Sequence, residues 1–272
     1  KLNLSAAGRY EAYSDVGDTA NPKFGARWEP LAGLAFRASY GRSFRAPFFD
    51  ELVGGANSRV QTIRLNDPAS PTGQTPVILL LGFDPELGPE KATSWTAGID
   101  VEPRVLPGAK LSLTWFDIRY RDRIASANSF LQTFFARRVV YGDLITDRPD
   151  AATVAAYYAD PTFSNTIGIP QAQIAAIVDV RTRNLSRSTV RGLDFDLSYS
   201  HRIGEGSVSL SFGGSRLFTL DNRLTAGAPA NNVVGTLGSP AKLRLRGRTG
   251  FNAGVFDGGL AINYTDDYRN LS

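Results

Sequence analysis

The stretch of sequence that decides the fold is Leu34-Ala35-Phe36-Arg37-Ala38-Ser39-Tyr40-Gly41. The side chains at 34, 36, 38 and 40 are apolar or aromatic, and those between them are small, polar or charged. A period of two is typical of a β-strand, because successive side chains point to opposite faces of the sheet. This stretch therefore predicts a strand with one apolar face and one polar face.

The same alternation recurs along most of the chain. About nine such segments are predicted, at residues 1–13, 22–30, 33–43, 93–102, 109–124, 183–200, 206–220, 240–252 and 258–268. Several are longer than the roughly five or six residues of a strand in a globular protein. Lengths of about ten or more suit strands that cross a bilayer at a tilt.

Short and long connections separate these segments. Short turns are predicted at 29–33, 103–109, 201–206 and 252–258, whereas the remaining connections are mostly long, over 44–92, 125–182 and 221–239. Several long loops are rare in compact soluble domains, but outer-membrane barrels combine short periplasmic turns with long external loops. Within the longest loop, residues 151–159 follow Pro149-Asp150 and residues 171–180 follow Pro170, which predicts two helical stretches.

These patterns predict an all-β fold: a portion of an antiparallel transmembrane β-barrel with short periplasmic turns and long extracellular loops. An open sheet edge cannot face lipid, so the first and last strands need further partners. We therefore expect a curved, open and incomplete barrel. The competing interpretation is a soluble β-sandwich, which predicts shorter strands and short loops throughout.

The composition excludes several classes of function. The 272 residues include no Cys and one His, so no disulfide framework, Cys nucleophile, thiolate site or His-rich metal site is expected. The net charge is +4, and the basic residues are spread along the chain without forming a block. No nucleic-acid partner is therefore predicted. The longest apolar run, residues 77–83, is too short for a transmembrane helix. Because the chain has no Met, Lys1 is not an initiator, so either an N-terminal segment is removed or the sequence is a piece of a longer chain. Together with the small number of predicted strands, this leads us to expect an internal fragment.

Two features of the sequence could act as catalytic groups. Asp194 and Asp196 share a strand face at a separation that a pair of glycosidase carboxylates could use. His201 could act as a base only if a serine and an acid converged on it. Polar residues on an inner barrel wall and a solvated turn explain both features better. The sequence therefore predicts no catalytic residue, no metal site, no resident cofactor and no enzyme.

Arginines, acids and aromatic residues divide into three predicted groups. Residues expected to face the barrel lumen are Arg37, Asp194, Asp196, Arg244 and Arg246. Residues of the long loops and strand extensions that could hold an anionic or aromatic ligand, or simply pack or pair within the protein, are Arg42, Phe44, Arg45, Phe48, Phe49, Arg59, Phe134, Phe135, Tyr157 and Tyr158. Aromatic residues that fit the two interfacial girdles of a membrane barrel are Trp28, Tyr40, Trp95, Trp115 and Tyr264.

Several motifs resemble one family. The run Ser43-Phe44-Arg45-Ala46-Pro47 closes a segment, residues 34–47, that resembles the barrel of TonB-dependent outer-membrane receptors. Residues 10–15, 21–30, 87–94 and 116–124 are similar to the same family, as is Val190-Arg191-Gly192-Leu193-Asp194-Phe195. The likeness spans most predicted strands and fails in the long loops.

The resemblance implies that residues 1–272 are part of a receptor barrel in the bacterial outer membrane. Its expected function is active uptake of a scarce nutrient, which in this family is most often a ferric siderophore. The energy is expected to come from the TonB–ExbB–ExbD complex and to act through a plug domain. The expected partners are therefore outer-membrane lipid, the plug, that complex and a small nutrient. The sequence departs from the family pattern in showing no plug, no TonB box, fewer than half the strands and no C-terminal aromatic residue. The alternatives are a passive porin or another outer-membrane barrel, such as a lipase, and a soluble sandwich that binds a ligand.

Overall fold

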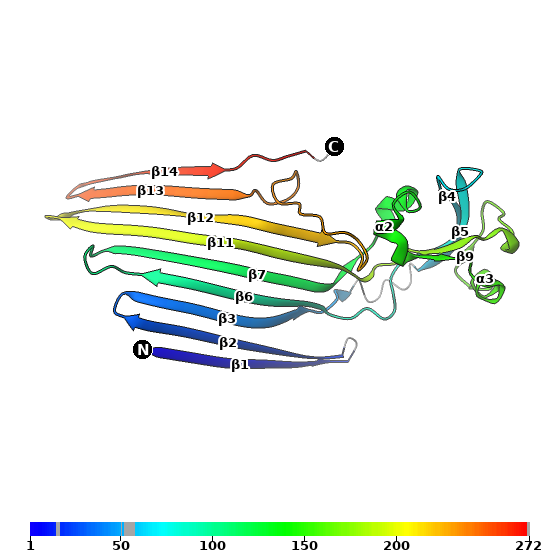
Figure 1. The fold of residues 1–272 in the computed structure, drawn as a ribbon, viewed down its shortest axis with the longest axis horizontal. Coiled ribbons are helices and arrows are strands. Elements are labelled where there is room, and N and C mark those ends of the chain that lie inside the picture. Colours follow the sequence, from blue (N-terminus) through cyan, green and yellow to red (C-terminus); the bar gives the residue numbers. More distant parts are fainter. Residues whose placement is uncertain (15–16, 50, 52–57, 271–272) are drawn as a thin grey trace.

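The computed structural model describes residues 1–14, 17–49, 51 and 58–270. Its main element is a nine-stranded antiparallel sheet in the order β1-β2-β3-β6-β7-β11-β12-β13-β14 (Figure 1). These strands are β1 (Leu2–Tyr13), β2 (Gly17–Leu31), β3 (Leu34–Arg45), β6 (Glu90–Val101), β7 (Ala109–Ala125), β11 (Arg183–Ile203), β12 (Gly206–Arg223), β13 (Leu243–Ala253) and β14 (Phe256–Thr265). Each matches a predicted segment, most with ends within a few residues, so the strand prediction is confirmed.

Short turns join neighbouring strands at one end of this sheet, the left end in Figure 1. The β2–β3 turn needs glycine at position 33, because its φ is +84° and a Cβ there would lie 2.2 Å from the carbonyl oxygen of Glu102. The turn before β7 needs Gly108 for the same reason: its φ is +90° and a Cβ would lie 2.0 Å from the carbonyl oxygen of Ser200. These glycines let the chain reverse closely against the neighbouring strand.

The sheet is open. Within the described residues, β1 pairs only with β2 and β14 only with β13, so the two outer strands do not meet. Figure 1 shows the amino-terminal and carboxyl-terminal strands at opposite edges of the sheet. The predicted curved, incomplete barrel portion is therefore confirmed as an unclosed antiparallel sheet, and the soluble sandwich with two packed sheets of short strands is not the fold.

A second sheet of five strands lies beyond the other end of the long strands (Figure 1). Its order is β8-β10-β5-β4-β9, with bounds β8 (Ile145–Asp147), β10 (Ala176–Asp179), β5 (Gln74–Leu81), β4 (Arg59–Asn66) and β9 (Phe163–Ser164). Two long connections, 44–92 and 125–182, together build this unit, because β5 of the first pairs in parallel with β10 of the second. We call residues 59–81 and 126–182 the loop unit. Sequence reasoning treated these connections as loops and missed its sheet.

The loop unit has a hydrophobic core on each face of its sheet. One cluster packs Leu65, Val77 and Leu79 against Phe134 and Tyr141. Phe134 directly follows the short 3-10 helix Asn128–Thr133, and Tyr141 is the last residue of α2 (Arg138–Tyr141). The other cluster is covered by α3 (Ala151–Tyr158), which contributes Val154.

One of the two predicted helices is confirmed. The helix α3 begins after Asp150, whose carboxylate accepts a hydrogen bond from the backbone N–H of Thr153 at 2.7 Å. The prediction of a helix at 171–180 is wrong, because only Gln171–Gln173 forms a 3-10 turn before strand β10 begins at Ala176. Side chains of β10 fill both cores of the loop unit, and this tertiary packing overrides the local preference.

The long strands leave a complete apolar face uncovered. Phe36 is 40 % exposed, Leu197 is 45 % exposed and Leu260 is 61 % exposed. In contrast, the largest fully buried apolar side chains of the described residues, including Phe134, Leu79 and Val178, belong mainly to the loop unit. A contiguous apolar face of this size marks a surface that meets another apolar medium.

Candidate functional site

The opposite face of the nine-stranded sheet is polar. One row of directly opposed residues runs from strand to strand across this face. It begins with Arg27 on β2, Arg37 on β3 and Gly98 on β6, and goes on to Thr114 on β7 and Asp194 on β11. The same row continues through Ser215 to Arg244 on β13. Directly opposed residues share a face of a sheet. The row is therefore one polar band across seven strands.

An ion-pair network joins four strands within this polar face. The carboxylate of Asp100 on β6 lies 2.9 Å from the guanidinium of Arg27 on β2 and 2.8 Å from that of Arg37 on β3. It also accepts a hydrogen bond from Ser112 on β7 at 3.0 Å. Gly98 leaves room for this arrangement, because a Cβ there would lie 3.0 Å from the Arg37 guanidinium. Arg37 also donates hydrogen bonds to Ser112 and Thr114 on β7, both at 2.9 Å. Asp100 and Arg37 together therefore link the side chains of four neighbouring strands.

The five residues predicted to line the lumen do lie on this face, but they do not form one cluster. Arg37 belongs to the Asp100 network, whereas Asp194 and Asp196 are exposed and make no ion pair within the described residues. Arg244 and Arg246 line a separate depression on β13, whose lining includes Asp196. The direct cross-strand partners of Asp194 and Asp196 are Thr114, Ser112, Ser215 and Gly213, and none of these four is basic.

Several predicted ligand residues gather where β3 leaves the sheet. Arg45 forms a bidentate ion pair with Glu90, at 2.9 and 3.0 Å, and lies 3.3 Å from Glu51. Its guanidinium also lies 4.6 Å from the ring centroid of Phe48. Phe48 and Phe49 are 62 % and 79 % exposed. We call Arg45, Phe48, Phe49, Glu51 and Glu90 the rim cluster.

The other predicted ligand residues are dispersed. Phe44 makes an edge contact with Tyr13 at 5.8 Å between ring centroids, and Arg42 donates to the hydroxyl of Tyr40 at 2.7 Å. Arg59 begins β4 in the loop unit, where it is exposed. The predicted set therefore does not form a single site.

The prediction that Phe134 and Phe135 contact a ligand is wrong. They are 0 % and 5 % exposed in the core of the loop unit, with Phe134 stacked on Tyr141 at 4.4 Å. Tyr157 and Tyr158 are partly buried against the cluster below α3. The Tyr158 hydroxyl donates to the carbonyl of Ile169 at 2.6 Å, and burial raises the pKa of Tyr158. For these aromatic residues the sequence pattern could not distinguish a core from a binding surface.

The five predicted interfacial aromatic residues all lie on the apolar face. Trp28 stacks on Phe36 with ring centroids 5.6 Å apart, and Tyr40 lies 4.6 Å from Trp95. Trp115 aligns across the sheet with Ala97, and Tyr264 aligns with Leu245. Trp28 and Trp95 are each 51 % exposed. Large rings that remain half exposed on an apolar face are typical of a membrane interface.

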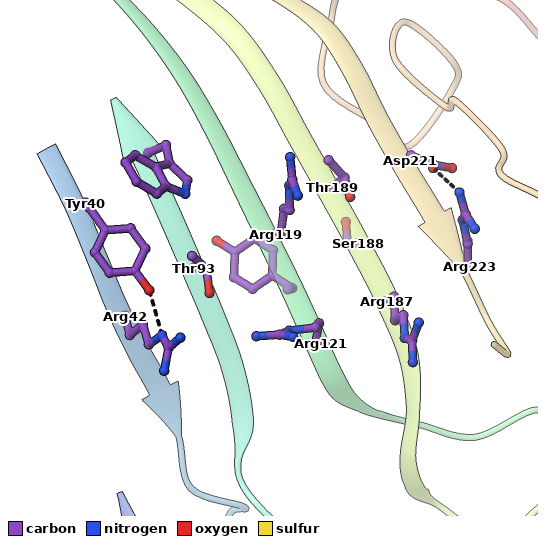
Figure 2. Close-up of a pocket in the computed structure, with 12 residues that line it drawn as sticks. Tyr40, Arg42, Thr93, Arg119, Arg121, Arg187, Ser188, Thr189, Asp221 and Arg223 are labelled. Atoms are coloured by element: carbon purple, nitrogen blue, oxygen red, sulfur yellow. Dashed lines mark hydrogen bonds and ion pairs between the residues drawn. The ribbon is translucent and has the colours of Figure 1, made fainter. Parts of the chain in front are cut away.

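Sequence reasoning missed a groove lined by five arginines. Figure 2 shows Arg42 of β3, Arg119 and Arg121 of β7, Arg187 of β11 and Arg223 of β12 around it. The groove has a volume of about 490 Å³ and is bordered by Tyr40 and Trp95. The missed signal is the continuation of the two-residue period past Trp115, where apolar residues give way to charged ones.

Within the described ranges, no three or more His, Asp or Glu side chains converge in a way that could bind a metal ion. Among the helices that the structure describes, none has the length and apolar character needed to cross a membrane. The charged features that the structure does describe are the ion pairs of the polar face and the arginines of the groove.

Comparison with solved structures identifies the architecture. The chain is similar to the siderophore receptor PirA from Acinetobacter baumannii, with 13 % identity and a TM-score of 0.58, over 96 % of this chain and 31 % of that one. It is also similar to a mutant of the ferric enterobactin receptor from Pseudomonas aeruginosa in complex with enterobactin. That match has 15 % identity and a TM-score of 0.59, over 97 % of this chain and 30 % of the receptor. At these identities the likeness shows the fold alone, and the chain spans about a third of these neighbours.

Sequence comparison identifies the family. A search of curated proteins found no match to the chain. The family model described as "TonB dependent receptor-like, beta-barrel" matches residues 1–272, the whole chain. That family consists of transport receptors of the Gram-negative outer membrane. The open antiparallel sheet, its separated polar and apolar faces and this match agree, and the chain belongs to the TonB-dependent receptor family as a portion of its β-barrel.

Proposed function

We propose that this chain forms part of the barrel wall of an outer-membrane receptor that binds a ferric siderophore and imports it with energy supplied through TonB. The observation that carries the proposal is the nine-stranded sheet itself, with a half-exposed apolar face and an ion-paired polar face. Two of the structural neighbours are named as siderophore or ferric enterobactin receptors. A plug domain, the TonB–ExbB–ExbD complex and outer-membrane lipid are the partners that this function requires.

In this proposal the two faces of the sheet have different tasks. The apolar face meets lipid, because every second residue along each strand is apolar there. The polar face lines the lumen, with Arg37, Asp194, Asp196, Arg244 and Arg246 along the route of the ligand. The Asp100 network fixes two of the arginines that lie on this wall. The wall contributes shape and charge, and the family offers no reason to expect bond-making chemistry in it.

The rim cluster is the best-supported place for ligand capture in this chain. Phe48 and Phe49 present exposed rings beside Arg45, and aromatic and cationic side chains suit an anionic ligand with aromatic groups. Arg45 is already paired with Glu90 and Glu51, so its charge is largely compensated. The exposed phenylalanines therefore carry the contact in this proposal, and Arg45 positions Phe48.

Uptake by cells tests the proposed function. The natural full-length gene that carries this sequence is expressed in an iron-starved strain that lacks its own siderophore receptors, and uptake of radioactive iron from ferric enterobactin and other ferric siderophores is measured. We expect uptake of at least one complex that disappears when TonB is deleted. Uptake that continues without TonB would support a passive porin. Equal uptake with and without the receptor gene, when the protein is present in the outer membrane, would contradict the proposal.

A further inference from the structure

The outer side of the sheet changes character at one level on four strands. We follow the apolar face along each strand, starting at the end that carries the short turns. Its residues are Phe36, Ala38 and Tyr40 on β3 and Ile99, Ala97 and Trp95 on β6. On the next two strands they are Leu113 and Trp115 on β7 and Phe195 and Leu193 on β11. The next residues on that face are Arg42 and Thr93, then Asp117 and Arg119 on β7, and Arg191 on β11. The apolar surface therefore ends at the Tyr40–Trp95 pair, and a charged surface begins directly beyond it.

The charged surface is rich in arginine, and three of the five groove arginines make no ion pair within the described residues. Asp117, which is 4 % exposed, lies 2.9 Å from Arg119 and 2.7 Å from Arg191. Asp221 lies 3.4 Å from Arg223. Within the described part of the chain, Arg42, Arg121 and Arg187 make no ion pair, and all three are exposed. Arg42 donates a hydrogen bond to the Tyr40 hydroxyl, so Arg121 and Arg187 are the least engaged of the three. The groove therefore presents positive charge that the protein itself does not neutralise.

The shape of the groove suits a phosphate group at the end of an apolar body. Figure 2 shows Arg121 and Arg187 on neighbouring strands, with Arg42, Tyr40 and Thr93 toward the other side of the groove. Guanidinium groups bind phosphate oxygens through paired, charge-assisted hydrogen bonds. The groove opens on the same face as Tyr40 and Trp95, which line it, and Trp95 is 51 % exposed. One molecule with a phosphorylated head and acyl chains can therefore contact both regions.

We propose that this groove binds the phosphate group of a lipid in the outer leaflet of the membrane, with Arg121 and Arg187 as the principal ligands. The inference rests on the proposed placement of the apolar face in lipid and adds a binding site outside the ligand route. The positive charge of the groove favours a ligand with an anionic head group. Because the groove directly borders the apolar face, that head group is expected to belong to a lipid. Aromatic rings collect at the level of the head groups, which places the arginines just beyond Tyr40 and Trp95 at phosphate height.

Lipid binding to the purified receptor tests this site. The natural full-length protein is delipidated in detergent, titrated with diphosphoryl lipid A, and its lipid adducts are counted by native mass spectrometry. We expect a saturable adduct whose affinity falls about tenfold or more in the double variant Arg121→Gln/Arg187→Gln, because two charged hydrogen-bond donors are lost. The variant Arg121→Lys/Arg187→Lys keeps the charge and should retain most of the binding.

A matched control removes the same charge elsewhere. Arg64 and Arg148 are exposed in the loop unit and make no ion pair within the described residues, so Arg64→Gln/Arg148→Gln should leave lipid binding unchanged. Dephosphorylated lipid A should bind much more weakly, and inorganic phosphate at millimolar concentration should not displace the lipid. Correct assembly of each variant is checked by its heat-dependent shift on gels.

Four results would overturn the proposal. These are unchanged binding in the Arg121→Gln/Arg187→Gln variant, an equal loss in the loop-unit control, equal binding of the dephosphorylated lipid, and displacement by inorganic phosphate, which would indicate a site for free anions. Siderophore binding is measured on the same samples and should not differ between the variants. Because lipid and siderophore are read separately, failure of this site and failure of the proposed uptake can be distinguished.

Discussion

At the scale of single residues, the polar face is organised by a few acids. Asp100 pairs with two arginines and accepts a hydrogen bond from a serine, on three other strands. Asp194 and Asp196, on the same face, have no ion pair among the residues that the structure describes. The sequence shows all three as acidic residues on predicted strands. Only the cross-strand register tells which of them faces an arginine, and that register depends on the pairing of strands far apart in the chain.

Replacing Asp100 tests the importance of this network. The variant Asp100→Asn should lower the free energy of unfolding by about 1–3 kcal/mol, because it weakens charged hydrogen bonds to Arg27 and Arg37. The matched variant Asp196→Asn, on the same face but without an ion pair, should change it by less than about 0.5 kcal/mol. Denaturant unfolding of the full-length protein in detergent measures both values. Equal effects of the two variants would mean that the network does not stabilise the sheet.

The Asp150 carboxylate gives a residue-level prediction that depends on pH. Hydrogen bonds from the backbone N–H and hydroxyl of Thr153 lower the pKa of Asp150 below its usual range. The stabilisation of α3 is therefore fully present above the ordinary carboxyl pKa and is lost as the pH falls through the lowered value. Asp150→Ala should abolish this dependence and raise amide exchange in α3 by roughly threefold to tenfold at neutral pH, as expected for loss of an N-cap.

Hydrogen exchange followed by mass spectrometry measures this effect at neutral pH, and circular dichroism across acidic pH follows the helix. Asp150→Asn is the control, because an amide oxygen can still accept the bond from Thr153 while the titrating charge is gone. Exchange in α3 that is the same in Asp150→Ala and in the unaltered protein would show that the cap does not hold the helix.

At the scale of elements, the long strands could be predicted from the sequence and the loop unit could not. The strands carry a two-residue period over ten or more positions, which few other structures produce. In the loop unit, β10 has four residues and β5 is largely apolar. The strands β4, β5 and β10 each contribute buried side chains to both cores, whose other members come from distant parts of the chain. A run such as residues 77–81 does not reveal by itself which distant segment will cover it.

The loop unit should respond to mutation separately from the long sheet. Phe134 is fully buried and stacks on Tyr141 in its core, so Phe134→Ala should destabilise the loop unit by about 3–5 kcal/mol. Limited proteolysis should then cut residues 126–182 while the long strands stay protected. Phe49→Ala, which removes a ring that is 79 % exposed, is the control and should leave the cleavage pattern unchanged. Simultaneous loss of both regions would show that they unfold as one unit.

At the scale of the whole molecule, the decisive property is that two faces of one sheet meet two different media. The apolar face is exposed along most of the sheet, and the polar face carries the charged rows. The candidate site could be predicted only in part from the sequence. Arg45, Phe48 and Phe49 do lie together in the rim cluster, whereas Phe134 and Phe135 are buried in the core of the loop unit. The arginine groove could not be predicted, because its residues come from five strands, some of them distant in the sequence, that are adjacent only in the folded sheet.

Accessibility of neighbouring residues on one strand tests the central claim most directly. The chain has no Cys, so Leu197→Cys and Ser198→Cys place single spin labels on opposite faces of β11 in this segment of the full-length receptor. In proteoliposomes, we predict that the label at 197 is accessible to oxygen dissolved in lipid and protected from a water-soluble nickel complex. The label at 198 should show the reverse. Equal accessibility at the two positions, or the opposite order, would contradict the assignment of the apolar face to the membrane.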